Sequence, residues 1–397
     1  MKKLLALLLA VLMVVALFAG CAPKADAPVA DEPAKDEPAK DEPAKDEPAK
    51  DEPAADEPAA GLDVDSLDLG EENTTHKVYR LDEVEATALA DGTVPAVNKF
   101  DALAYEGTLK VGFSQMEVNN NWRIVENASM EQAIKAAGFA FEYRDAESSA
   151  EKQNRDIMDL VDADCDIIVV APFEATGMQT GLQYAADAGI PVVEIDRQTE
   201  GVCLTQCLGD FVDVGMKQGQ FMRDLYGDAT INFLEITGTA GSSVAMDITK
   251  GIDQFMAADG NMNRIASGDG NFTQSTSLDV AENLIQANGG KFNAMFVHVD
   301  DSALAAIQAL KDAGYTPGAD VANGEIGIVS MCGYTYGFKA MQAGELAASV
   351  ECTARFGPVV LDIIARILEG GEISSRLVMP CMVYTYENCN DYVQDAL

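Results

Sequence analysis

From Thr108 onward, short apolar runs alternate with longer stretches in which apolar residues recur at helical spacing. The short runs are rich in Val and Ile, which indicates strands that are buried on both faces. Several of the helical stretches end in glycine, the residue that most often closes a helix. The predicted strands are 109–113, 139–143, 166–171, 191–195, 231–236, 264–268, 294–299 and 326–331, and the predicted helices are 122–138, 149–163, 178–189, 214–227, 275–290 and 303–314.

This alternation predicts an α/β fold, in which parallel sheets carry helices on both faces. The patterned region after residue 106 holds about 290 residues, which is long for one such sheet. We therefore expect two Rossmann-like doubly wound parallel-sheet lobes. In open parallel sheets, ligands bind beyond the carboxyl ends of the strands, so the residues at the strand ends are the first candidates for a site.

The first 21 residues indicate export from the cytoplasm. Two lysines precede an apolar run that ends at Phe18, and Ala-Gly-Cys21 follows. The run is short for a membrane-spanning helix, which needs about 20 apolar residues, but it fits a signal peptide. Its ending resembles a bacterial lipobox, which implies lipidation of Cys21; an ordinary cleaved signal with a chance cysteine is the alternative. We expect an extracytoplasmic protein that a lipid anchors to the cell membrane.

Residues 22–106 are predicted to form a spacer and linker. DEPAK occurs four times in residues 31–50, and DEPAA occurs twice in residues 51–60. Regularly placed proline blocks helix and sheet, and at about 3.1 Å per residue the tract would span roughly 90 Å. The tract is either a spacer that lifts a domain off the membrane or a drifted repeat without a tuned length. Residues 61–106 remain acidic and irregular, so we expect a linker or a loosely attached extension there.

Charge and cysteine content restrict the partners. The net charge of -38 argues against binding to nucleic acid or to anionic lipid head groups. With Cys21 lipidated, seven of the eight cysteines remain, and an odd number leaves at least one free thiol. Cys203 and Cys207, predicted on one strand, would stand about 13 Å apart, too far for a disulfide. With His76 and His298 as the only histidines, a structural zinc site is not expected. We expect buried free thiols and no cofactor.

Polar, glycine and aromatic residues gather where the predicted strands end. The segments that follow six of the strands are SQMEVNNNWR, PFEATGM, DRQT, TGTAGSSVAMD, DDSA and CGYTYG. A sugar presents many hydroxyl groups and an apolar C–H face, so it needs carboxylates, amides and arginine forks beside an aromatic ring. Asp196 with Arg197, and the segment 120–123, supply these groups. The alternatives are a surface pair for Asp196 and Arg197, and for Trp122 an aromatic ring tucked into the core.

The stretch from about residue 108 to residue 387 resembles the class I bacterial sugar-binding proteins of ABC importers, of the ribose- and galactofuranose-binding type. The motifs that carry the resemblance, in order, are VGFSQ…NNWRIVEN, VVAPFEATGM, IPVVEIDRQ, GTAGSSVAMDITKG, AAIQALKDAGYTPG and FKAMQAGELAASVECTARFGP. The resemblance implies two lobes, 107–208 with 351–380 and 209–350 with 381–397, joined by three crossing segments. It also implies a monomeric receptor that closes on a monosaccharide and delivers it to an ABC permease.

Carried over by position, this resemblance proposes ligand contacts and also shows departures. The contacts that the resemblance implies are Asn120, Trp122, Arg123, Asp196, Arg197 and Glu351, with Gln115 nearby. The chemistry of the strand ends adds Asn121, Ser243 and Asp300 as polar candidates. Where the family has arginine, asparagine and aspartate, this chain has Ile248, Val299 and Cys332. If these three face the cleft, the ligand is less polar on that side, or it binds in another orientation, or the protein no longer binds a sugar. Tyr334 and Tyr336 are candidate replacement contacts.

Two other classes of function compete with a sugar receptor. A receptor for a nucleoside-like or signal molecule that feeds a sensor would use the same closed form. An enzyme finds little support, because GTAGSS lacks the lysine of a phosphate-binding loop, and GxGxxG, GxSxG and HExxH are absent. His298, the one histidine in the patterned region, is more typical of a structural role. The export signal and the lack of an N-terminal helix-turn-helix exclude a lactose-repressor-type regulator.

Overall fold

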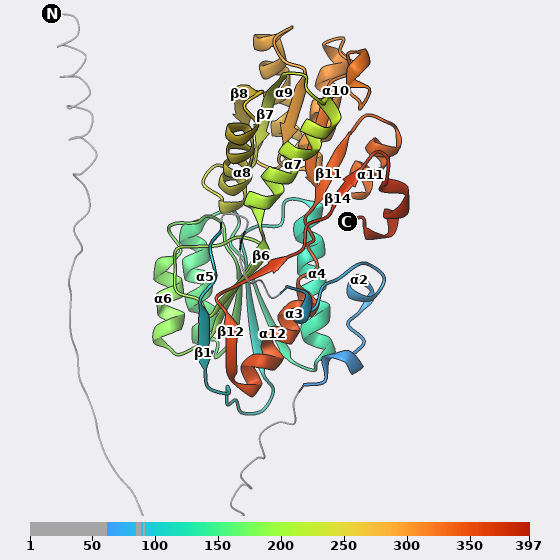
Figure 1. The fold of residues 1–397 in the computed structure, drawn as a ribbon. Helices are drawn as coiled ribbons and strands as arrows, with labels where there is room; N and C mark the ends of the chain where they lie inside the picture. The colour runs from blue at the N-terminus through green and yellow to red at the C-terminus, as the bar shows by residue number, and fades with distance from the viewer. Residues whose placement is uncertain (1–61, 85–88, 90–91) are drawn as a thin grey trace, which may run out of the picture. The chain divides into compact units, whose positions relative to one another are not determined.

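The computed structural model describes residues 62–84, 89 and 92–397, so the Cys21 lipidation site and the DEPAK tract lie outside the described residues. Within the described residues, two six-stranded sheets form, with helices packed around each (Figure 1). The prediction of two doubly wound parallel-sheet lobes is confirmed.

The first sheet has the strand order β13-β6-β5-β4-β2-β3, and all its neighbouring strands are parallel. We call this sheet and its helices the N-terminal lobe. Its strands are β2 (Lys110–Gln115), β3 (Ala140–Asp145), β4 (Ile167–Ala171), β5 (Val192–Ile195), β6 (Thr205–Gly209) and β13 (Arg376–Met379), and its helices are α4 (Asn121–Ala136), α5 (Ala150–Asp162), α6 (Gln179–Asp187) and α12 (Gly357–Glu369).

Alternate residues of β4 enter two different cores of this lobe. Val169 packs in the cluster that includes Met130 of α4, whereas Val170 packs in the cluster that includes Leu160 of α5. Both faces of the strand are therefore buried, which explains its unbroken apolar sequence. Full burial of each such side chain contributes about 1.5–3 kcal/mol.

The second sheet has the order β14-β11-β10-β9-β7-β8 and is parallel except for β14, which pairs antiparallel with β11. We call this sheet and its helices the C-terminal lobe. Its strands are β7 (Ile231–Thr237), β8 (Met262–Asp269), β9 (Ala294–Val297), β10 (Gly327–Cys332), β11 (Ala348–Glu351) and β14 (Val383–Thr385), and its helices are α7 (Phe211–Tyr226), α8 (Ser243–Asp259), α9 (Gln274–Asn288), α10 (Asp300–Asp312) and α11 (Thr335–Gln342).

Helices α7 and α8 approach each other unusually closely. A Cβ atom added at Gly215 of α7 would lie 2.2 Å from the carbonyl oxygen of Ile248 on α8, and one added at Gly251 would lie 2.0 Å from that of Val212. Both positions therefore require glycine. The close contact also fixes which face of α8 turns toward α7.

The chain passes between the lobes at three places in the described residues. These crossings run from β6 to α7, from β11 to α12, and from β13 to β14. Each crossing leaves a strand at its carboxyl end. The crossings and the ends of the central strands therefore lie in the same region of the molecule, where the lobes meet.

Residues 62–84, which we call the N-terminal strap, pack on the lobes. The strap contains the short helices η1 (Val64–Ser66), α2 (Glu71–Thr74) and α3 (Leu81–Val84). Its apolar residues Val64, Leu69, Tyr79, Leu81 and Val84 are buried in the main core cluster.

Polar contacts hold the strap along its length. The amide of Asn73 donates to the carbonyl of Ser129 on α4 at 2.9 Å. The guanidinium of Arg80 makes two bonds to the carboxylate of Asp362 on α12, at 2.6 and 2.7 Å. The expectation of a linker or loosely attached extension is therefore wrong for this part. The contacts lie far away in sequence, so no local periodicity marks the buried positions.

A short strand that follows the strap forms a separate two-stranded sheet. β1 (Val97–Phe100) pairs antiparallel with β12 (Gly371–Ser374). The segment around residue 100 therefore joins the chain near its other end, beside the strand β13 of the first sheet.

The seven cysteines between residues 165 and 389 are free thiols. Cys203 precedes β6, so the expectation that it shares a strand with Cys207 is wrong by two residues. Among the described residues, none of the helices has the length and apolar character needed to cross a membrane. In the same part of the chain, no cluster of three or more His, Cys, Asp or Glu side chains is placed to hold a metal ion.

Candidate functional site

A cleft of about 440 Å³ lies between the two lobes, at the carboxyl ends of the strands; this volume includes space open to solvent. Its lining residues are Glu117, Asn120, Trp122, Arg123, Asp196, Arg197, Val244, Phe272, Val299, Met331, Cys332, Tyr334 and Cys352. Five of the ten predicted ligand-binding residues are among them.

An ion pair joins the first turn of α4 to the loop after β5 in the cleft. The guanidinium of Arg123, at the start of α4, donates to the Asp196 carboxylate at 2.6 Å and to Glu126 at 2.7 Å. The side chain of Asn120 caps α4 by accepting from the backbone N–H of Arg123 at 3.0 Å. This cap fixes the start of the helix and therefore the backbone position of Arg123. Asp196 has a φ of 62°, an uncommon value for a residue other than glycine. Such backbone strain is typical of functional sites.

The charges of this cluster are set by burial and by one another. Burial alone would lower the pKa of Arg123, but Asp196 and Glu126 raise it above its ordinary value. Burial raises the pKa of Glu126 to about 7, although Arg123 opposes this rise. Burial, and then the charge of Arg123, lower the pKa of Arg197 to about 10. Both arginines therefore remain cationic at neutral pH.

Arg197 has unused hydrogen-bonding capacity. It donates from one terminal nitrogen to the carbonyl of Phe173 at 2.7 Å. Its Nε is buried without a hydrogen-bond partner and stands 3.6 Å from the carboxylate of Asp196, too far for a hydrogen bond. Its guanidinium lies 5.7 Å from the ring centroid of Phe272, which comes from the C-terminal lobe. An oxygen-rich ligand would supply the missing acceptor.

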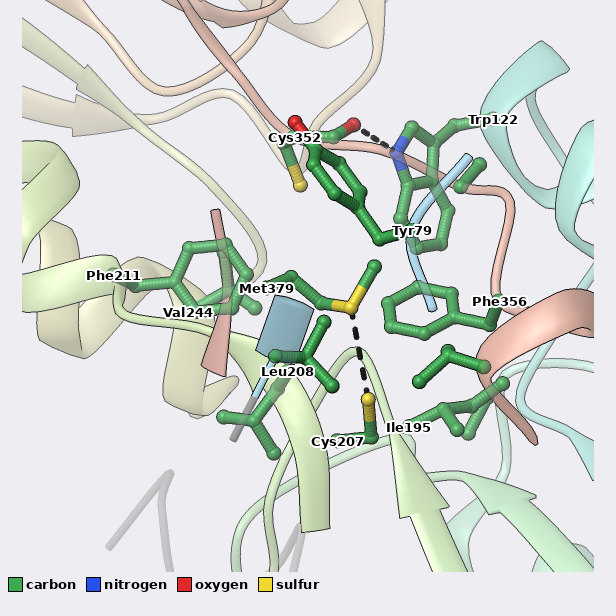
Figure 2. Close-up of a cluster of buried hydrophobic side chains, with 14 of the residues drawn as sticks. Tyr79, Trp122, Ile195, Cys207, Leu208, Phe211, Val244, Cys352, Phe356 and Met379 are labelled. Atoms are coloured by element: carbon green, nitrogen blue, oxygen red, sulfur yellow. Dashed lines mark hydrogen bonds between the residues drawn. The ribbon is translucent and has the colours of Figure 1, made fainter. Parts of the chain in front are cut away.

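Trp122 combines the two roles that the sequence left open. Its ring lines the cleft, but the residue is only 6% exposed and belongs to the main core cluster. Its indole N–H donates to the carbonyl of Cys352 on the second crossing at 3.0 Å, as Figure 2 shows. The ring of Phe356 packs edge-on at 6.2 Å, and the guanidinium of Arg123 lies 4.7 Å from the indole ring. Trp122 thus connects α4 to the crossing as well as to the cleft.

Gln115 and Asn121 do not line the cleft. The amide of Gln115 donates to Glu126 at 2.8 Å and to Asn127 at 2.9 Å, so it supports the cluster around Arg123 from behind. Asn121, the first residue of α4, is exposed. Both are predicted ligand contacts, but Gln115, the last residue of β2, turns to Glu126, and Asn121 lies on a solvent-exposed face of α4.

Ser243 joins the lobes and does not line the cleft. Its hydroxyl accepts from the backbone N–H of Gln198 in the N-terminal lobe at 3.1 Å. The N–H of Ala175 donates to the carbonyl of Gly241 at 3.4 Å beside it. Together with the contact of Arg197 and Phe272, these bonds hold the lobes closed over one side of the cleft.

Asp300 is buried inside the C-terminal lobe. Its carboxylate accepts from the hydroxyl groups of Ser330 and Ser349, the latter at 2.7 Å, and from the N–H groups of Gly333 and Tyr334 at 3.0 and 2.8 Å. Burial raises its pKa to about 6. It therefore positions the loop that carries Tyr334 and is not available to a ligand.

Glu351, which the resemblance placed at the ligand, is held by the N-terminal strap. Its carboxylate accepts from the hydroxyl of Tyr79 at 2.8 Å and from Lys77 at 3.3 Å, and it also accepts from the N–H of Met382 at 3.1 Å. It is not among the residues that line the cleft. The strap occupies this carboxylate at the point where two of the crossings meet.

Two of the three family departures face the cleft. Val299 and Cys332 line it, but Ile248 is fully buried and does not line it; its backbone carbonyl lies where α8 meets Gly215 of α7. The hypothesis about Ile248 is therefore wrong, and Val244, one turn earlier on α8, lies in the cleft instead. Cys332 has a φ of 118°, which marks a strained turn at the end of β10.

Sequence reasoning missed several lining residues. Phe272 follows β8, and the same rule that selected the other strand ends would have found it, because β8 was predicted. Glu117 lies in the segment that follows β2, beside the predicted contacts of that segment. Val244 and Met331 gave no signal, because apolar residues on a helix or strand usually belong to the core.

Known proteins resemble this chain in sequence. A family model for the periplasmic binding protein domain matches residues 111–372. The galactofuranose-binding protein YtfQ of Escherichia coli strain K12 is 31% identical over 285 residues, which cover 70% of this chain and 88% of that protein.

Two solved structures share the fold. The crystal structure of a galactofuranose-binding protein superimposes with a TM-score of 0.68 at 29% identity. This match covers 72% of the present chain and 97% of the chain in that structure. The periplasmic binding protein of an arabinose ABC transporter from Shewanella sp. ANA-3, bound to α- and β-L-arabinofuranose, has a TM-score of 0.67 at 31% identity. This match covers 72% of the present chain and 94% of that structure.

Proposed function

The chain belongs to the periplasmic binding protein family, and from this we propose that it captures a monosaccharide between its lobes and delivers it to an ABC importer. The observation that carries the proposal is the Arg123–Asp196–Arg197 cluster, which lies at the carboxyl ends of the strands in a cleft between two lobes. Carboxylate and guanidinium groups bind sugar hydroxyls through charge-assisted hydrogen bonds. The relatives named for galactofuranose and arabinofuranose support a furanose as the ligand.

Binding in this proposal makes and breaks no covalent bond. The lobes rotate about the three crossings and trap the ligand. The bond from Gln198 to Ser243 and the contact of Arg197 with Phe272 then belong to the closed form. A permease that recognises the closed lobes would accept only the loaded receptor.

The same proposal extends to the place of the protein in the cell. A lipid on Cys21 holds the chain at the outer side of the cell membrane, and residues 22–61 act as the spacer. The receptor works as a monomer, and it contacts the membrane through its lipid only. Replacing Cys21 with serine should release the protein into the medium or the periplasm, and retention of the variant in the membrane fraction would contradict lipid anchoring.

Thermal unfolding tests the receptor proposal. The chain from residue 22 onward is heated with a panel of furanoses, pyranoses, polyols and nucleosides. A ligand at 100 times its Kd should stabilise the fold by about 2.7 kcal/mol, which raises Tm clearly. A rise in Tm with a sugar supports the proposal. A rise with nucleosides alone, or a Tm that no compound in the panel raises, would overturn it.

A matched pair of variants ties such a shift to the cleft. Arg197→Lys removes the planar guanidinium. It should raise the Kd of the tightest-binding sugar about 10-fold or more, because lysine cannot replace a bidentate guanidinium. Arg155→Lys makes the same change on α5, where the side chain is 58% exposed and paired with Glu151. Equal losses in both variants would show that the sugar binds elsewhere.

A further inference from the structure

The cleft is divided by polarity between the two lobes. All its charged lining residues, Glu117, Arg123, Asp196 and Arg197, come from the N-terminal lobe. The C-terminal lobe contributes Val244, Phe272, Val299, Met331, Cys332 and Tyr334, which carry neither a charge nor an amide. We call these six residues the apolar wall.

The polar side chains that lie just behind the apolar wall already have partners. Asp300 accepts four hydrogen bonds inside its lobe. Asp301 accepts from the hydroxyl of Tyr336 at 2.6 Å, and His298 bonds with Glu235 at 3.0 Å. None of these side chains lines the cleft. The wall therefore offers a ligand only groups of its own.

Those groups are few. The thiol of Cys332 is a weak donor and acceptor. Burial raises the pKa of Cys332 well above its ordinary value, so it remains a neutral thiol. Tyr334 contributes a phenol whose ring stacks on Tyr336 at 4.8 Å. The remaining four wall residues have no polar side-chain atom, apart from the sulfur of Met331.

A ring hydroxyl pressed against this wall would lose its bonds to water and gain few in return. A buried hydroxyl without a partner weakens binding roughly 5- to 150-fold. A methyl or methylene group at the same place would lose nothing and would gain the contact. The energetic balance therefore favours a ligand that lacks hydroxyl groups on the edge facing the C-terminal lobe.

We propose that the ligand is a deoxy monosaccharide, whose hydroxylated edge meets the Arg123–Asp196–Arg197 cluster and whose methyl or methylene edge meets the apolar wall. This inference rests on the proposed function, because it assumes that the cleft binds a sugar. It names the class of sugar from the division of the cleft.

Isothermal titration with matched sugar pairs tests the inference. The chain from residue 22 onward is titrated with D-galactose and D-fucose, with L-mannose and L-rhamnose, and with D-ribose against its 2-deoxy and 5-deoxy forms. At least one deoxy sugar should bind about 5-fold or more tightly than its hydroxylated parent. If every parent binds as tightly as its deoxy form or more tightly, the inference falls and the proposed function stands. If no sugar of either kind binds, the proposed function itself falls.

Variants of the wall supply a second readout. Val299→Thr and Cys332→Ser each place a hydroxyl in the wall with little change of volume. Each should reduce the preference for the deoxy form by about 3-fold or more, because the parent hydroxyl gains a partner. Val202→Thr makes the same change at a 53% exposed position before β6 and should leave the ratio unchanged. An unchanged ratio in both wall variants, with Tm values near that of the parent protein, would overturn the inference.

Discussion

The hydrogen bond from Tyr79 to Glu351 should contribute measurably to the stability of the fold. Replacing Tyr79 with phenylalanine removes one hydroxyl and keeps the ring, which is 5% exposed and packed in the main core. The lost bond spans 2.8 Å and ends on a buried carboxylate. A hydrogen bond to a charged group contributes about 1.5–3 kcal/mol. Because Lys77 and the N–H of Met382 still contact Glu351, we expect the lower half of that range, about 1.5–2 kcal/mol.

Urea unfolding measures this loss as a lower midpoint at an unchanged slope. Tyr184→Phe is the matched control, since Tyr184 donates to Asp162 at 2.9 Å but is 38% exposed. An exposed bond of this kind should contribute less than about 0.5 kcal/mol. If the two variants lose the same amount, the N-terminal strap does not belong to the cooperative fold, and the reasoning about residues 62–84 is refuted.

Two further predictions concern the buried cluster around Arg123 and the contact between the lobes. Because burial raises the pKa of Glu126 from 4.5 to about 7, the folded protein keeps a proton that the unfolded chain releases, so the free energy of unfolding should fall as the pH rises from about 4.5 to about 7. Glu126→Gln should remove up to about 3 kcal/mol of this fall, measured by urea unfolding at pH 5 and pH 8, while the fall due to Asp300 remains; an unaltered pH profile would contradict the burial argument. Ser243→Ala removes the inter-lobe bond from Gln198 and should weaken sugar binding about 2- to 10-fold in titration, and an unchanged Kd would show that this bond does not hold the closed form.

The N-terminal half of the cleft could be predicted from the sequence because topology places it. Arg123 and Asp196 are 73 residues apart, yet their side chains meet at 2.6 Å. Each follows a strand of one parallel sheet, and the carboxyl ends of such strands lie side by side. The sequence motifs also resembled the ribose- and galactofuranose-binding type, and the comparisons confirm this resemblance.

The C-terminal half could not be predicted, because three-dimensional contacts decide which residue turns to the cleft. Ile248 matches a family contact position, but it lies one turn after Val244, where the glycines at 215 and 251 let α8 pack closely on α7, and it is fully buried. Asp300 carries a carboxylate that could bind a sugar hydroxyl, but it already accepts four hydrogen bonds inside its lobe. A motif gives the type of a residue and its order in the chain, but not the partners that compete for it.

The prediction of a loosely attached extension was wrong for residues 62–84 for a related reason. Its buried residues follow no helical or strand period, because they fill gaps on helices that the chain builds much later. Glu351 is an example: it is a predicted ligand contact, but its carboxylate accepts a hydrogen bond from Tyr79, more than two hundred residues earlier in the chain. A stretch without pattern can therefore be ordered wherever a later surface offers it a fit.

Trp122 also gives this protein a built-in optical probe. It is the one tryptophan of the chain, so the indole emission comes from a single place. That place borders the cleft, the guanidinium of Arg123 and, through the bond to the carbonyl of Cys352, the crossing about which the lobes turn. Emission wavelength and intensity will therefore respond both to occupancy of the cleft and to movement of the crossing, without any attached dye. Stopped-flow recording of this signal can separate ligand arrival, whose rate rises with sugar concentration, from lobe closure, whose rate reaches a plateau.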